Sequence, residues 1–238
     1  MDRYIKDSQV SCNNCNLDSI CLPRGLNRDE VEDLSIVVKN NAVLQKGEYI
    51  YRQGDEFQSI VAIKSGTAKL VTLDDQGNEH ILNVLLPGEL IGFDGLYQNK
   101  YTCSAIALEI INYCELPAAQ FDAVCKNIPS IARELFKHSS EIINESQGRM
   151  ITNKRSAEEK LAIFLLNLSD RLKKRGFSAV EFNIPLSRQE MGDYLGLTIE
   201  TVSRMLKQFQ NDKLINIQKR HVEIIDIQGL RNLVSGEL

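Results

Sequence analysis

Three cysteines near the start of the chain have the spacing of metal ligands. Cys12, Cys15 and Cys21 form a C-x2-C-x5-C motif in a chain whose start shows no secretory signal. Cysteines packed this closely in a reducing compartment are more often metal ligands than disulfide partners. An iron–sulfur cluster usually takes four thiolates, so a later cysteine should complete the set. The candidates are Cys103, Cys114 and Cys125.

Two other kinds of metal protein fit a four-cysteine set. Four cysteines can hold a structural zinc ion, which would give a folded regulator without a redox response. An iron–sulfur electron carrier or enzyme is the other alternative. The sequence has no Ser/His/Asp arrangement and no phosphate-binding glycine loop, and its three histidines lack ligand spacing: His80, His138 and His221. We therefore expect a protein that is not an enzyme.

The hydropathy pattern predicts a cytoplasmic protein without a membrane partner. The chain starts Met-Asp-Arg-Tyr-Ile-Lys, which lacks the apolar core of a signal peptide. Its longest apolar run is Leu161–Leu166, far shorter than the ~20 residues that a membrane helix needs.

Charge is distributed unevenly along the 238 residues. The net charge is −4, yet residues 151–238 carry 14 Lys/Arg against 11 Asp/Glu, whereas residues 1–150 carry 14 against 21. An acidic first half and a mildly basic second half suggest a sensing part followed by a part that contacts nucleic acid. A solvated surface explains the small basic excess about as well.

The first half has the pattern of a sensor domain made of strands. Residues 1–29 are polar, show no helical or strand period, and read as a cysteine-rich loop without a core of its own. Residues 30–118 contain short apolar runs punctuated by glycine, which predicts an antiparallel β-roll or jelly roll. The clearest predicted strands are Ser59–Ile63, Ala68–Leu73 and Ile81–Leu86, with a hairpin tip at 75–78.

Residues 119–152 predict a long amphipathic helix with two apolar stripes. Leu135, Ile142 and Glu145 follow heptad spacing and are the predicted dimer seam, while a second stripe repeats every seven residues at Phe136, Ile143 and Met150. One stripe can pack on the β-roll while the other meets a partner helix; a helix that only covers its own domain is the alternative. Two copies of Glu145 would oppose association, leaving a marginal dimer.

The segment 153–238 predicts a winged helix-turn-helix. Ser187 and Glu190 form a capping box, Gly196 can end the first helix, and Thr198 can cap the second. On the second helix, Glu200, Ser203 and Arg204 lie opposite the apolar face, where a recognition helix reads bases. Thr198 and Thr201 are candidates for phosphate contacts. Leu214–Ile217 and Val222–Ile225 then predict the two strands of a wing. An ordinary surface ion pair between Glu200 and Arg204 is the alternative reading of that pair.

Nearly the whole chain resembles the cyclic-AMP receptor protein superfamily, and within it the oxygen-responsive FNR branch (fumarate and nitrate reduction regulators). Four motifs carry the resemblance: C-N-N-C-N-L-D-S-I-C at 12–21, G-E-L-I-G-F-D at 88–94, A-L-E-I-I-N-Y-C-E-L-P at 107–117 and Y-L-G-L-T-I-E-T-V-S-R at 194–204. The resemblance implies that Cys114, which precedes Glu115-Leu116-Pro117, is the fourth ligand.

The resemblance also implies a function. It implies one [4Fe–4S] cluster per subunit and a homodimer that binds a TTGAT-type inverted repeat without oxygen. It further implies contact with RNA polymerase, activation or repression of transcription, and release of DNA when oxygen destroys the cluster. Cyclic-nucleotide relatives clamp the phosphate with an arginine, which is Cys103 here, so we expect no cyclic-nucleotide binding. The chain departs from the family pattern at two positions. Asn16, next to Cys15, bears on the oxygen reactivity of the cluster, and Ile199, before Glu200, bears on the DNA half-site that is read.

Overall fold

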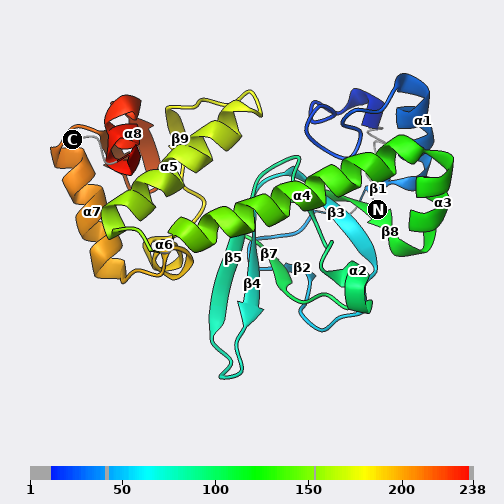
Figure 1. Cartoon of the computed structure of the whole chain (residues 1–238), viewed down its shortest axis with the longest axis horizontal. Coiled ribbons are helices and arrows are strands. Elements are labelled where there is room, and N and C mark those ends of the chain that lie inside the picture. Colours follow the sequence, from blue (N-terminus) through cyan, green and yellow to red (C-terminus); the bar gives the residue numbers. More distant parts are fainter. Residues whose placement is uncertain (1–11, 41–42, 153, 236–238) are drawn as a thin grey trace, which may run out of the picture.

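The structure, a computed structural model, describes residues 12–40, 43–152 and 154–235. The first eleven residues of the predicted cysteine-rich segment, and residues 153 and 236–238 of the predicted DNA-binding segment, lie outside the described residues. The described part is α+β, as the sequence predicts. In Figure 1 the long helix α4 (Pro129–Thr152) runs over the β domain and leads to the C-terminal domain.

The β domain of the described chain is built from two four-stranded antiparallel sheets. Across the first sheet the strands are β1 (Lys39–Asn40), β8 (Asn112–Pro117), β3 (Ser59–Ser65) and β6 (Leu90–Ile91). Across the second they are β2 (Tyr49–Tyr51), β7 (Ser104–Ala107), β4 (Ala68–Leu73) and β5 (Glu79–Leu85). Their inward faces enclose one apolar core, which confirms the predicted β-roll.

The predicted hairpin joins β4 to β5. The Asp74 carboxylate accepts hydrogen bonds from the backbone N–H groups of Gln76 and Asn78, both at 2.9 Å. Gly77 takes a φ of +81°, a conformation that glycine adopts without steric cost. The turn therefore starts one residue earlier than its composition suggests, and β5 starts two residues earlier than the predicted strand at Ile81.

The β domain also contains short helices. They are η1 (Cys12–Asn14), α1 (Arg28–Val37), α2 (Gly95–Gln98), η2 (Ala118–Gln120) and α3 (Phe121–Asn127). Asn27 and Glu30 form a capping box at the start of α1. The prediction of a coreless N-terminal loop is wrong for its described part, because Leu22 is 2% exposed and packs into the β-domain core together with Leu34 of α1.

The two stripes of α4 have different surroundings. Ile131 and Leu135 are buried in the β-domain core, whereas Phe136, Ile143 and Met150 are exposed by 77%, 57% and 71%. Leu135 thus packs within its own chain, which differs from the expectation that it faces a partner helix. The heptad pattern alone could not distinguish the stripes, because both repeat every seven residues.

The C-terminal domain combines four helices with a small sheet in the described residues. The helices are α5 (Ala157–Lys173), α6 (Arg188–Leu195), α7 (Ile199–Asn211) and α8 (Ile227–Ser235). The antiparallel sheet has the order β10 (Ile215–Gln218), β11 (His221–Ile224) and β9 (Glu181–Asn183). Strands β10 and β11 are the predicted wing, shifted by one residue at each end.

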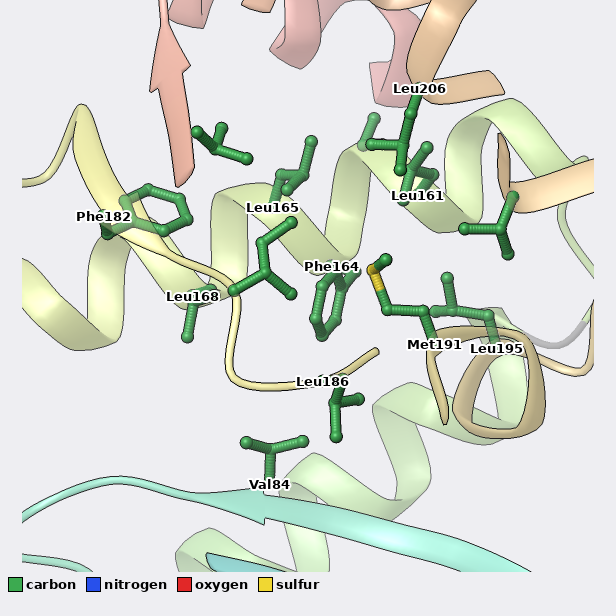
Figure 2. Close-up of a cluster of buried hydrophobic side chains, with 14 of the residues drawn as sticks. Val84, Leu161, Phe164, Leu165, Leu168, Phe182, Leu186, Met191, Leu195 and Leu206 are labelled. Carbon is green, nitrogen blue, oxygen red and sulfur yellow. The ribbon is translucent and has the colours of Figure 1, made fainter. Parts of the chain in front are cut away.

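The core of the C-terminal domain continues into the β domain. Val84 on β5 faces Leu186, with Phe164 and Leu168 of α5 beyond it (Figure 2). Lys69 on β4 adds a polar link, since its ammonium group lies 2.8 Å from Glu79 and 3.3 Å from Glu190 of α6. The two domains are therefore docked on each other. Within the described residues, no helix is both long enough and apolar enough to cross a membrane.

Candidate functional site

The four predicted ligands line one cavity. Cys12, Cys15 and Cys21 reach it from the N-terminal segment, and Cys114 reaches it from β8. Backbone turns shape the N-terminal side: the N–H of Cys15 donates to the carbonyl of Cys12 at 3.3 Å, and that of Cys21 donates to the carbonyl of Leu17 at 2.9 Å. Leu22, buried directly after Cys21, anchors this segment to the β domain.

The other cysteines lie elsewhere. Cys103 is buried in the β-domain core, and its thiol donates to Asp94 at 3.6 Å. Burial, followed by the neighbouring Asp94 carboxylate, raises the pKa of Cys103 to about 12. Cys125 sits on α3 and does not line the cavity. The structure thus brings Cys114 to the N-terminal cysteines and leaves the two other candidates apart from them.

Burial favours the protonated form of three of the cavity thiols. Burial raises the pKa of Cys21 to about 12 and that of Cys114 to about 11, and it also raises the pKa of Cys12. The Cys114 thiol donates to the side-chain oxygen of Asn40 at 3.2 Å. Since thiolates are the metal-binding form, binding at this site has to release these protons.

The donor set is one that an iron–sulfur cluster takes. In the described chain, no three His, Cys, Asp or Glu side chains lie close enough together to hold one metal ion. A zinc ion requires its sulfur ligands at ~2.3 Å from one centre, whereas a cluster distributes its four thiolates over several iron atoms. Four thiols line the shared cavity, which is the number of thiolates that a cluster usually takes.

The DNA-contacting helices form as the local signals predict. The Ser187–Glu190 capping box starts α6, Gly196 ends it with φ +64°, and the Thr198 hydroxyl accepts from the N–H of Thr201 at 3.2 Å to start α7. Val202, Leu206 and Phe209 are buried on one face of α7. This pair of helices is a helix-turn-helix.

The predicted base-reading side chains lie on the open face of α7. Glu200 and Arg204 are exposed and Ser203 is half-buried, while Thr198 and Thr201 meet at the start of the helix with their hydroxyl oxygens 3.1 Å apart. No ion pair joins Glu200 to Arg204 in the described structure, so their charged groups are available to a ligand. At the wing tip, Lys219 and Arg220 are exposed.

The remaining seam residues of α4 face a second cavity. Ile142 and Glu145 line a space of about 700 Å³ between the β domain, α4 and the C-terminal domain. Cys103 and Arg171 line other parts of it. The predicted seam is therefore split: Leu135 is buried, and Ile142 and Glu145 border a cavity of their own chain.

Sequence reasoning missed an ion-pair group at this domain junction. Glu89, in the turn before β6, binds Arg171 of α5 with 2.9 Å between Nε and Oε1, and it binds Arg175 at 2.6 Å. The only sequence signal was the Gly88-Glu89-Leu90 segment, which does not show that its carboxylate meets arginines more than eighty positions later.

Two family models match the two structural units. The model described as a Crp-like helix-turn-helix domain matches residues 159–233, and the model described as a cyclic nucleotide-binding domain matches residues 42–127. A cyclic-nucleotide-type β domain joined through a long helix to a DNA-binding winged helix defines a transcription regulator, not an enzyme.

Full-length relatives extend the comparison. The chain is 40% identical over 231 residues to the transcriptional activator protein anr of Pseudomonas aeruginosa, which covers 97% of this chain and 95% of the relative. It is 35% identical over 225 residues to the fumarate and nitrate reduction regulatory protein of Vibrio cholerae, covering 94% of this chain and 90% of the relative. The chain belongs to the Crp/Fnr family of transcription regulators, on its FNR/Anr-like side.

A solved structure supports the fold assignment. FixK2 from Bradyrhizobium japonicum aligns with a TM-score of 0.75 at 26% identity, covering 83% of this chain and 97% of that one. DNA binding through a Crp-type helix-turn-helix follows from this family membership, and dimerisation is typical of the family.

Proposed function

We propose that the chain is a cytoplasmic oxygen sensor that regulates transcription, holding a [4Fe–4S] cluster on Cys12, Cys15, Cys21 and Cys114. The observation that carries this proposal is the shared cavity, into which the N-terminal segment brings three thiols and β8 brings the fourth. When bound, the cluster supplies an oxygen-labile connection between that segment and the β domain.

The residues around the cavity prepare the site for such a group. Leu22 and Leu26 hold the end of the N-terminal segment on the β-domain core. Asn40 already contacts the Cys114 thiol at 3.2 Å. The half-buried Lys64 lies in the cavity lining, and its charge lowers the pKa of Cys12 and Cys114 against the dominant effect of burial. A cation at this place favours the deprotonated thiols that bind metal.

Dimerisation is proposed along α4. An exposed apolar stripe on α4 is formed by Phe136, Ile143 and Met150. In a monomer this apolar surface would face water, and such surfaces mark contacts with a partner. We name this set the exposed stripe and assign it the main partner contact. Ile142 is 39% exposed and can contribute at the edge of that contact. A marginal dimer of this kind can be switched by a modest change in the β domain.

The dimer would present two α7 helices to successive major grooves of an inverted TTGAT-type repeat. Arg204 suits bidentate pairing with guanine, Glu200 accepts from a cytosine amino group, and Ser203 contacts the adjacent base. Thr198 and Thr201, at the start of α7, are proposed to contact phosphate. RNA polymerase contacts are proposed at the β4–β5 turn and near residues 65–67, with activation or repression set by the promoter.

An anaerobic purification tests the cluster. Iron and acid-labile sulfide should be present at four of each per chain, with a visible absorption band that air removes. Cys114→Ala should abolish the band, whereas the matched variant Cys125→Ala should retain it. Stoichiometric zinc in place of iron would establish the structural-zinc regulator instead. A full band in Cys114→Ala would show that Cys114 is not the fourth ligand.

A further inference from the structure

Arg24 joins the N-terminal segment to the long helix. It lies three positions after Cys21, on the segment that carries three of the proposed ligands. Its Nε lies 3.1 Å from the Glu134 carboxylate, and its Nη1 lies 3.1 Å from the Glu141 carboxylate, about two helical turns further along α4. One guanidinium therefore spans two carboxylates on the helix, a geometry for which its planar fork is suited. We call these three residues the Arg24 clamp.

The burial of Glu134 makes this contact more than a surface ion pair. The Glu134 side chain is only 7% exposed, and a buried carboxylate requires charged or hydrogen-bonding partners. Lys137 supplies one partner from the same helix. Arg24 is the partner that comes from another element, so its position depends on where the N-terminal segment lies.

Two further contacts tie the same segment to the same helix. The His138 imidazole, between the two carboxylates in sequence, lies close enough to the backbone of Cys21 to interact with it electrostatically. Gly25 lies directly against Glu134, because a Cβ at Gly25 would come within 2.9 Å of the Glu134 carboxylate oxygen. Cys21, Arg24 and Gly25 thus all lie against one stretch of α4.

That stretch adjoins the exposed stripe. Glu134 and Glu141 flank Phe136 in sequence, and Glu141 lies two positions before Ile143. A shift of the N-terminal segment would move Arg24 relative to both carboxylates. It would leave Glu134 with only its partner on α4 and release Glu141 into water.

We propose that Arg24 is a coupling residue, which transmits the state of the cysteine cavity to α4 and thereby to the dimer contact. This inference rests on the proposed function, since it assigns the route by which that site would act on the helix. Arg24, Glu134 and Glu141 do not line the cysteine cavity, so the clamp changes the coupling and not the capacity to hold the cluster.

The test compares Arg24→Gln with a matched Arg28→Gln control. Arg28 is exposed at the start of α1. For each protein, sedimentation equilibrium gives the dimer dissociation constant under anaerobic conditions, with the cluster and after its removal by air and chelator. The ratio of the two constants measures the coupling. In Arg24→Gln this ratio should fall roughly five-fold or more, within the usual range of allosteric coupling, while iron and sulfide per chain stay at the parental level. Arg28→Gln should keep the parental ratio.

A second variant distinguishes loss of coupling from a folding defect. Glu141→Gln removes only the exposed half of the clamp, since Glu141 is 55% exposed, and should lower the ratio by a smaller amount. In cluster-bound protein, hydrogen exchange of residues 131–142 should be faster in Arg24→Gln than in Arg28→Gln. An Arg24→Gln protein with full cluster and an unchanged ratio overturns the coupling role. A parent protein without iron, or with equal constants in both states, refutes the proposed function itself and reduces the clamp to a structural ion pair.

Discussion

Glu89 and Arg171 form a two-point ion pair across the domain junction, with 2.9 Å between Arg171 Nε and Oε1 and 2.5 Å between Arg171 Nη2 and Oε2. Arg175 binds the same carboxylate at 2.6 Å. Both arginines also donate to backbone carbonyls of the β domain, at Val84 and Pro87. The carboxylate is thus the shared partner of two cations on α5, the first helix of the C-terminal domain.

Glu89→Gln should destabilise the docked protein. A neutral amide leaves two partly buried guanidinium groups without their counter-charge, and hydrogen bonds to charged groups are worth about 2 kcal/mol each before solvent screening. We expect a loss of roughly 1–3 kcal/mol in the free energy of unfolding, measured by urea denaturation. Glu32→Gln, on an exposed position of α1, is the control. Equal stability of the two variants would contradict a docking role for Glu89.

Cyclic AMP should not bind. Cys103 offers no guanidinium for a cyclic phosphate, and Glu89 is already engaged by two arginines. Titration calorimetry of the parent protein with cyclic AMP should show no saturable heat, although the β domain matches the cyclic nucleotide-binding family model. Tight stoichiometric uptake would show that another donor replaces the missing arginine.

Ile143→Glu should weaken the dimer. A carboxylate on the exposed stripe of each subunit is desolvated and repelled at the contact, so the dimer dissociation constant should rise roughly ten-fold or more. Ile36→Glu on α1, where Ile36 is 81% exposed, introduces the same change away from α4 and should have no effect. Sedimentation equilibrium of anaerobic protein provides the measurement.

Glu145→Ala tests which face of α4 makes the dimer contact. If Glu145 meets its own copy, as the predicted seam requires, its removal should tighten the dimer and allow DNA binding in air. If the exposed stripe makes the contact and Glu145 faces the cavity that it lines, the dissociation constant should stay near the parental value. The same sedimentation series resolves these outcomes.

Arg204→Ala should weaken specific DNA binding by about 1–3 kcal/mol and relax the preference at one base pair. Lys173→Ala, at the exposed end of α5, removes a cation outside the helix-turn-helix and should leave that preference intact. Fluorescence anisotropy with TTGAT-type duplexes and single-base variants, at fixed salt, separates the two effects. A uniform loss on every duplex would indicate that Arg204 contacts phosphate rather than a base.

The linker between α4 and α5 should contribute an acid-sensitive part of the stability. Arg155, and then the backbone and hydroxyl of Ser156, lower the pKa of Glu159 from 4.5 to about 2. Between these values the unfolded chain binds more protons than the folded one, so the contribution is complete above pH 4.5 and is lost as pH falls toward 2. Glu159→Gln keeps the capping geometry without the titration. Its stability should converge with that of the parent on acidification in urea melts, and a constant difference at all pH values would contradict this role for Glu159.

Local signals predicted the DNA-contacting part well. The Ser187–Glu190 capping box, the positive φ of Gly196 and the Thr198 cap each depend on residues within four positions of one another. Such interactions form in the same way whatever surrounds them, so the sequence alone contains the information. The cavity cysteines could not be grouped from local signals alone. Family resemblance selected Cys114, and in the structure it lines the same cavity as the other three.

Contacts that depend on tertiary packing could not be predicted from the sequence. The third strand of the small sheet, β9, has three residues, too few to show a period, and it forms by pairing with β11. The burial of Leu135 depends on how α4 rotates over the β domain, which heptad spacing does not specify. The pairing of Arg24 with Glu134 joins positions 110 residues apart, and no local rule links them.

The core that continues from Val84 into Leu186 and Phe164 limits how this protein can be recombined with its relatives. A chimaera that joins this β domain to the winged helix of another family member would bring together two half-interfaces shaped by different sequences. Because packed interiors tolerate mismatched volumes poorly, such an exchange has to carry residues 81–89 together with α5. The β domain and the C-terminal domain should in this sense evolve as one unit, and substitutions on either side of the junction are expected to change together.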